Sequence, residues 1–183
     1  MRKFDYTFLK KISVPADIMN SATSIYEMKA KAELRRTDFA DVFSAMESVA
    51  KIQSVKSSNA IEGIITTDKR IRDIVNKSTV PQGHNELEIA GYRDALDLIH
   101  SSYSDIPFSE KSILELHRML LQPSGDDLAG KYKTEDNFIM ETDRRGVRSV
   151  RFTPVPASET SAAMEQLILA YHATYSESEI NPL

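Results

Sequence analysis

Ser57-Ser58-Asn59-Ala60-Ile61-Glu62-Gly63 ends a long helical pattern with a carboxylate at a position where helices disfavour negative charge. The final turn of a helix carries the negative end of the macrodipole, and an exposed acid there costs about 0.3–1 kcal/mol. Gly63 suits the left-handed conformation just past a helix end, which places Glu62 on the last turn and Ser58 one turn earlier on the same face. The segment therefore predicts a presented acid and hydroxyl that await a cationic partner outside the helix.

Helical patterns extend from this segment in both directions. Upstream, apolar residues at helical spacing run over residues 39–50 and predict one long helix. Phe39, Phe43 and Met46 of this stripe are expected in the core. Pro15 suits the first position of an earlier helix, because its missing N–H is not needed there. Further helices are expected at about 69–76, 85–101 and 109–121 and from Ser158, with residues 66–68, Ser109 and Ser158 as their caps.

The pattern changes beyond the turn residues 123–127. Short runs at 138–142 and 147–152 flank Asp143-Arg144-Arg145-Gly146, in which Gly146 can supply the positive φ of a hairpin turn. Thr153-Pro154-Val155-Pro156 ends the second run, because proline has no N–H to continue a strand. The chain is therefore predicted to be mainly α, a bundle of about six to seven helices with one β-hairpin.

Composition places the chain among cytoplasmic globular proteins. Of its 183 residues, 41% are hydrophobic and 27% are charged, as in soluble domains. No apolar run approaches the ~18 residues of a membrane helix, and residues 1–6 lack the apolar core of a secretory signal. No cysteine is present, which excludes disulfides and thiolate metal sites. The net charge of -4 argues against nucleic acid or an anionic membrane as a general partner.

The order of these pieces resembles the Fic family (filamentation induced by cAMP), whose members typically transfer AMP from ATP to a protein hydroxyl. One Fic subclass carries an inhibitory helix with the pattern Ser/Thr-x-x-x-Glu-Gly/Asn, and Ser58-Asn59-Ala60-Ile61-Glu62-Gly63 is similar to it. Leu116-His117-Arg118-Met119-Leu120 resembles the family's L-H-x-x-L segment, and Gly130-Lys131-Tyr132-Lys133 resembles its G-x-Y-R segment, with lysine in the last place. The hairpin corresponds to the family's flap. The similarity runs from about Ala50 to Leu183, and it implies an incomplete Fic fold.

The family's catalytic signature, H-P-F-x-D/E-G-N-G-R-x-x-R, does not occur in these 183 residues. In the family its histidine is the base, its acid holds Mg²⁺ and its glycine-rich turn cradles the nucleotide phosphates. Asn181-Pro182-Leu183 resembles the start of the helix that leads to it. We therefore assign no catalytic residue and no metal ligand, and we expect the chain alone to be inactive and to need no cofactor. The resemblance implies ATP and Mg²⁺ for the complete family protein. Neither the signature nor metal-ligand spacing surrounds the histidines, which are His84, His100, His117 and His172.

The resemblance implies roles for two sets of residues. Ser58, Glu62 and Gly63 would form the inhibitory motif. In the family its glutamate pairs with the last arginine of the signature and blocks seating of the ATP γ-phosphate, since an Arg–carboxylate pair can compete with a phosphate. An ordinary glycine-capped helix end is the alternative. A target-binding flap, which would pair with an extended protein substrate by strand addition, would include Phe138, Ile139 and Met140.

A basic cluster surrounds the hairpin, and three uses of it remain open. Its cations could contact nucleic-acid phosphates, form a solvated face, or lie beside a protein segment bound to the flap. Interleaved acids dilute the positive field and favour the solvated face over nucleic acid. The cluster consists of Lys131, Lys133, Arg144, Arg145, Arg148 and Arg151.

Three interpretations follow, two of which assign a function. The chain is the N-terminal regulatory and flap-bearing portion of a Fic-type protein adenylyltransferase, or it is a non-catalytic binding module that supplies its inhibitory helix in trans to a separate Fic core. A helical scaffold without present activity is the third option. Residues 1–83 would form the helical region with the inhibitory helix ending at 57–63, and residues 84–183 an incomplete N-terminal half of a Fic core with its flap at about 137–153.

The last expected helix has an apolar stripe without a partner in this chain, formed by Met164, Leu167, Ile168 and Tyr171. Exposed apolar patches favour association. We therefore expect a homodimer or swapped assembly that covers this C-terminal helix, or disorder of the last ~20 residues.

Overall fold

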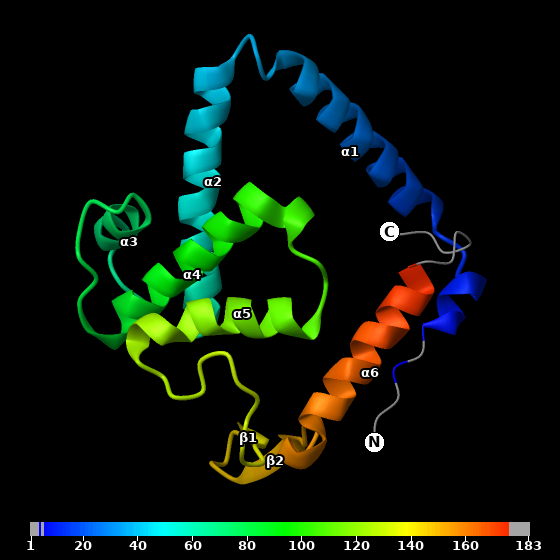
Figure 1. Ribbon diagram of the computed structural model, residues 1–183, viewed down its shortest axis with the longest axis vertical. Coiled ribbons are helices and arrows are strands. Elements are labelled where there is room, and N and C mark those ends of the chain that lie inside the picture. The colour runs from blue at the N-terminus through cyan, green and yellow to red at the C-terminus, as the bar shows by residue number, and fades with distance from the viewer. Residues whose placement is uncertain (1–3, 5, 176–183) are drawn as a thin grey trace.

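The computed structural model describes residue 4 and residues 6–175 (Figure 1). Within these residues it contains six α-helices and one two-stranded antiparallel hairpin, which confirms the mainly helical prediction. None of these helices combines the length and apolar character that crossing a bilayer requires. Residues 181–183 lie outside the described part. The helices are α1 Ala16–Arg35, α2 Ala40–Ile61, α3 Asp68–Val75, α4 Gly83–Ser102, α5 Glu110–Leu121 and α6 Ala157–Tyr175, the strands are β1 Ile139–Thr142 and β2 Arg148–Phe152, and the 3₁₀ turns are η1 Thr7–Lys11, η2 Tyr103–Asp105 and η3 Gln122–Ser124.

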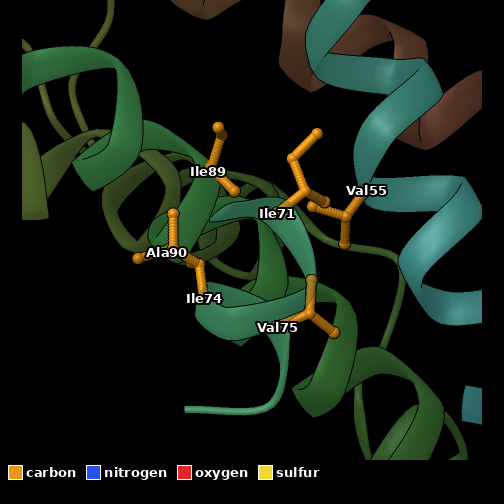
Figure 2. Close-up of a cluster of buried hydrophobic side chains, with 6 residues drawn as sticks. All are labelled: Val55, Ile71, Ile74, Val75, Ile89 and Ala90. Carbon is orange, nitrogen blue, oxygen red and sulfur yellow. The ribbon is translucent and has the colours of Figure 1, made fainter. Parts of the chain in front are cut away.

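The hydrophobic core lies where α2, α3 and α4 meet. Val55 of α2, Ile74 of α3 and Ile89 of α4 are its most deeply buried large side chains and belong to one cluster (Figure 2). Helix α3 contributes several members because its apolar residues share one face. The cluster joins residues on both sides of position 83, so one core spans the loop at 78–83. The remaining buried members are Ile71, Val75 and Ala90.

Helices α4 and α5 approach each other at the backbone. A Cβ atom added to Gly91 would lie 2.3 Å from the carbonyl oxygen of Leu120 and 2.8 Å from that of Met119. Only glycine leaves room for this contact, because any side chain would collide with the main chain of α5. Gly91 therefore sets how closely α5 packs on the core helices.

A charged clamp joins α3, the following loop and α4. Arg70 Nε donates a 2.8 Å hydrogen bond to Glu86 Oε1, and its Nη2 pairs with Oε2 of the same carboxylate. Arg70 also donates to Thr79 Oγ1 and to the Val80 carbonyl oxygen, while the Gln82 amide donates to Glu86. The hydrogen bonds from Arg70 lower the pKa of Glu86 to about 2, although its burial acts in the opposite direction. The loop between α3 and α4 is thus held by side chains at both of its ends.

The N-terminal half of α2 and all of α1 extend away from this core (Figure 1). Ala22 is the one buried residue of α1, and Leu34 near its end is 80% exposed. Phe39, the residue directly before α2, is exposed. On α2, Met46 is 63% exposed, while Phe43 is half-buried. The prediction that this stripe lies in the core is wrong for Phe39 and Met46. The helical period is present, but no described element packs over the first turns of α2.

The hairpin and α6 are joined at their base by one carboxylate. Asp136 Oδ1 accepts a 2.7 Å hydrogen bond from the backbone N–H of Ala157, the first residue of α6. The expected cap, Ser158, instead lies inside the helix, so that prediction is wrong. A carboxylate at a helix N-terminus accepts a hydrogen bond from an N–H group that has no partner within the helix. Its negative charge is also stabilised by the positive end of the helix dipole. Two other expected caps are confirmed. The side chain of Thr67 accepts a hydrogen bond from a backbone N–H at the start of α3, and the side chain of Ser109 does the same at the start of α5.

Helix α6 returns from the hairpin toward the N-terminal segment (Figure 1). There, Gln166 forms two hydrogen bonds with the main chain of Phe4, of 2.6 and 2.7 Å. Three residues of the predicted apolar stripe are half-buried, and Tyr171 is exposed. Residues 164–175 belong to the helix, so the expected disorder is not observed in this part. The half-buried residues are Met164, Leu167 and Ile168.

Candidate inhibitory site at the end of α2

The end of α2 is a Schellman motif built on Gly63. Gly63 has φ +78, its amide donates to the Ala60 carbonyl at 3.1 Å, and the Ile64 amide donates to the Asn59 carbonyl at 2.9 Å. These are the two bonds by which a left-handed residue satisfies the last carbonyls of a helix. A Cβ on Gly63 would meet no atom within 4 Å, so glycine is needed here for backbone conformation and not for space. The predicted glycine cap is confirmed.

Glu62 occupies the cap position directly after α2. Its φ of -83 and ψ of 5 lie outside the helix, whereas the sequence pattern placed it on the last turn. Its side chain is exposed and makes no ion pair within the described residues. The carboxylate therefore faces solvent beside the negative end of the helix, where nothing among these residues neutralises it. Such a group is available to a cation from outside.

Ser58 is held by α4. Its Oγ accepts a 2.8 Å hydrogen bond from the hydroxyl of Tyr92, and its side chain is half-buried. Ser58 and Glu62 thus have separate environments, because the serine already has an internal partner and the glutamate has none. The joint site of acid and hydroxyl stays a prediction. Glu62 is the presented group, and Ser58 anchors the helix end.

Asn59 is a second anchor that sequence reasoning missed. It is buried, and its Nδ2 donates a 2.8 Å hydrogen bond to the Val55 carbonyl one turn earlier. Val55 itself is fully buried in the core cluster (Figure 2). A buried asparagine carries polar groups that require partners, and its place in the motif was the one available signal. Core packing and this polar contact together hold the last turns of α2.

Two exposed isoleucines flank the presented acid. Ile61 is 83% exposed and Ile65 is 73% exposed, on either side of Glu62 and Gly63. Isolated exposed apolar residues are ordinary, but here two of them border an unpaired carboxylate on a firmly packed helix end.

The flap residues lie on a separate, open part of the molecule. Phe138, Ile139 and Met140 are 55%, 50% and 42% exposed. The predicted hairpin turn is confirmed, because Gly146 has φ +82 and its amide donates to the Asp143 carbonyl at 3.0 Å. In Figure 1 the hairpin lies at the bottom of the view, below α5. The structure therefore presents these residues to solvent and does not bring them to Glu62.

The two downstream segments that resemble family motifs meet in the structure. His117 Nδ1 accepts a 3.1 Å hydrogen bond from the backbone N–H of Gly130. Gly130 has φ +73, and a Cβ there would lie 2.8 Å from Arg118 Cβ. Lys133 donates to Asn137 Oδ1 at 2.5 Å. His117 acts as a fixed acceptor that holds the loop after α5, which gives it a structural role.

No described group of three or more His, Asp or Glu side chains is arranged to hold a metal ion. A hollow of about 850 Å³ lies beside α2 and the end of α4, with Lys51, Asp97 and His100 in its lining. Lys51 and Asp97 form an ion pair there. Neither Ser58 nor Glu62 lines this hollow, so it does not extend the candidate site.

Comparison of the chain with protein-family models and with curated proteins gives no match.

Proposed function

We propose that this chain is the regulatory and flap-bearing N-terminal portion of a Fic-type protein adenylyltransferase, restrained by Glu62. In this proposal the catalytic signature is supplied by residues outside this sequence, and AMP is transferred from ATP to a protein hydroxyl. The observation that carries the proposal is the exposed Glu62 carboxylate, which has no ion pair within the described residues and stands on a rigid helix end.

The physical role of Glu62 is competition for a guanidinium group. An arginine that binds a carboxylate through two parallel hydrogen bonds cannot bind a phosphate in the same way at the same time. Glu62 can compete only if its position is fixed, because each unfixed rotatable bond reduces the effective concentration of the carboxylate. The Val55 packing, the Asn59 hydrogen bond and the Tyr92–Ser58 hydrogen bond supply that fixation.

The test begins with the coding frame beyond Leu183. We expect it to contain the signature, and we expect the extended protein to transfer labelled AMP from ATP slowly. Glu62→Ala should raise that transfer about tenfold or more, which corresponds to ~1.4 kcal/mol of lost inhibition. Glu165→Ala, an exposed acid on α6 without an ion pair in the described residues, is the matched control and should change nothing. An unaltered rate in Glu62→Ala, or strong transfer by the 183-residue chain alone, would overturn the proposal.

Inhibition in trans is the second candidate function. The exposed Ile61 and Ile65 favour it, because they give the helix end an apolar surface that a separate Fic core could cover. Here the 183-residue chain should co-purify with a Fic core, and Glu62→Ala should abolish that binding. Equal recovery of the wild type and the variant would count against inhibition in trans.

A further inference from the structure

The hairpin carries a positive surface that the inhibitory site does not use. Between Ile139 and Phe152 the chain has four arginines and two carboxylates, in a protein whose net charge is -4. All four arginines are exposed. They are Arg144 and Arg145 in the turn, Arg148 at the start of β2 and Arg151 near its end.

None of these four arginines forms an ion pair with another described residue, whereas four arginines outside the hairpin do. Arg36 pairs with Glu47, Arg70 with Glu86, Arg93 with Asp94 and Arg118 with Glu115. The hairpin's own acids are engaged by other donors. Asp143 Oδ1 accepts the amides of Arg145 and Val147 at 2.8 and 2.9 Å, and Glu141 accepts a 3.4 Å hydrogen bond from Ser149. The four guanidinium groups therefore remain available to an external anion.

Apolar side chains accompany these charges. Phe138, Met140, Val150 and Phe152 are all exposed on the same hairpin. Arginine together with aromatic residues and methionine is the composition enriched in protein–protein interfaces. A solvated hairpin with no partner would leave this apolar surface in water, so the combination favours a protein partner.

The hairpin also has unpaired strand edges. It contains only β1 and β2, so each strand has one edge without a neighbour in the described structure. The register shifts between Ile139 and Met140, because β2 places an additional residue, Arg151, between their partners Phe152 and Val150. A bulge bends the strand that contains it. The edge of β1 is therefore the more regular of the two for an added strand.

We propose that the hairpin binds an extended acidic segment of a protein, which adds as a strand along β1. Its carboxylates lie at the turn end, near Arg144, Arg145 and Arg148, and its apolar residues lie near Phe138 and Met140. Arg148 lies opposite Thr142, one strand away from the added segment. Neighbouring strands are about 4.8 Å apart, so the added strand lies two spacings, about 9.6 Å, from the backbone of Arg148. The Arg148 side chain and a glutamate side chain of the added strand can together span that separation. This inference deepens the proposed function by naming the chemistry of the target segment, and it depends on that function for the identification of the hairpin as the target-binding flap.

The observations favour an acidic protein segment over a nucleic acid. A phosphate backbone is attracted to a continuous field of one sign, whereas Glu141 and Asp143 lie among the arginines of this hairpin. The exposed phenylalanines and methionine lie beside a strand edge, where apolar side chains of an added strand would cover them. Nucleic-acid binding is accordingly a competing outcome of the test.

The test is a titration in which a probe is added to the ¹⁵N-labelled 183-residue chain and binding is monitored through the amide chemical shifts. Four ten-residue probes are compared: an acidic peptide, half glutamate and half alternating threonine and valine; the same peptide with lysine for glutamate; the acidic peptide N-methylated at alternate residues; and oligothymidylate. We expect shifts confined to residues 138–152 with the first probe, weakened by added salt, and at least tenfold weaker binding of the lysine and N-methylated peptides.

Charge-reversal variants complete the experiment. Arg144→Glu with Arg148→Glu should weaken binding of the acidic peptide about tenfold or more, and the corresponding alanine variant should weaken it less. The matched control is Arg35→Glu with Arg72→Glu, two helical arginines that also lack an ion pair in the described residues, and it should leave binding unchanged. The amide spectrum of each variant reports whether the fold is intact.

Four results would overturn the inference: no shift with the acidic peptide, equal binding of the lysine or N-methylated peptide, oligothymidylate binding as tight as that of the acidic peptide, or an equal loss of binding in the control variant. The result is independent of the Glu62 experiment, because it measures peptide binding and not AMP transfer. Failure of one therefore does not decide the other.

Discussion

The hydroxyl of Tyr92 on α4 donates a 2.8 Å hydrogen bond to Ser58 Oγ on α2, across 34 residues of sequence. This bond lies one helical turn before Glu62, beside the packed core that contains Val55. Helix α4 therefore helps to determine where the exposed carboxylate stands. In the proposed function this support matters, because the effect of Glu62 would depend on where its carboxylate is held.

Tyr92→Phe should loosen the end of α2. The change removes one side-chain hydrogen bond and retains the ring, so we expect a loss of about 1 kcal/mol in the free energy of unfolding, measured by urea denaturation. Tyr103→Phe is the control, because Tyr103 is exposed, and it should have little effect. Faster amide exchange at residues 58–64 in the first variant would locate the change. Equal stability of the two variants would show that the Tyr92 bond contributes nothing.

Gly63→Ala should destabilise the chain through the backbone alone. The site has φ +78 and open space around a Cβ, so the expected loss is about 1–2 kcal/mol from the left-handed conformation. Gly63→Asn should lose less, since asparagine tolerates this conformation better. Thermal unfolding followed by circular dichroism measures both variants. If alanine and asparagine have the same effect, the backbone explanation is incorrect.

Gly91→Ala should be destabilising although it replaces glycine inside a helix. On an exposed helix this change gains about 0.5–1 kcal/mol. Here the added Cβ would lie 2.3 Å from the Leu120 carbonyl oxygen, so we expect a loss of about 1–3 kcal/mol from the forced separation of α4 and α5. Asn85→Ala, on the exposed first turn of α4, reports the propensity gain without a collision. Urea denaturation measures the free energy of unfolding of Gly91→Ala. A loss supports the collision with α5, and a gain would show that no such collision occurs.

Stability should fall in acid through Glu86. The pKa of Glu86 is lowered from 4.5 to about 2 by its hydrogen bonds from Arg70. A lowered carboxyl pKa stabilises the folded state above the unfolded pKa, and this contribution is lost as the pH falls from about 4.5 to about 2. Glu86→Gln should have a lower melting temperature than the wild type at pH 7, and the difference should shrink across this range. A difference that stays constant between pH 7 and pH 2 would exclude Glu86 as the source.

Self-association should follow from the exposed apolar residues of α1, α2 and α6. Ile25 and Met46 are exposed on the first two helices, and Leu169 is exposed on α6. We propose a homodimer in which a second copy covers such surfaces, and we expect light scattering to show a mass that rises with concentration. Leu169→Lys should restore the monomer if α6 forms the contact, and Met46→Lys should do so if α2 forms it. Val80→Lys, an exposed apolar site in the loop after α3, is the control. A wild-type monomer at all concentrations would contradict the proposal.

The outcome for α2 shows where sequence reasoning succeeded and where it did not. Its period over residues 39–50 predicted one long helix running toward Ser58–Gly63, and the helix Ala40–Ile61 forms. The same period placed Phe39 and Met46 in the core, yet both are exposed, while Val55 is buried. A periodic stripe identifies the face of a helix that can be buried. It does not show how much of that face another element reaches.

The local chemistry of the chain determined its helices, its hairpin and several of their ends. Gly63 and Gly146 adopt positive φ and Thr67 caps α3, because these preferences act over only a few residues. Tertiary structure decided the contacts between distant segments: Asp136 caps α6 from 21 residues away, and Tyr92 reaches Ser58. Such contacts depend on how the helices pack, which no local pattern encodes. The sequence therefore identified Glu62 as an unusual acid, and only the fold showed that it stands exposed on an anchored helix end.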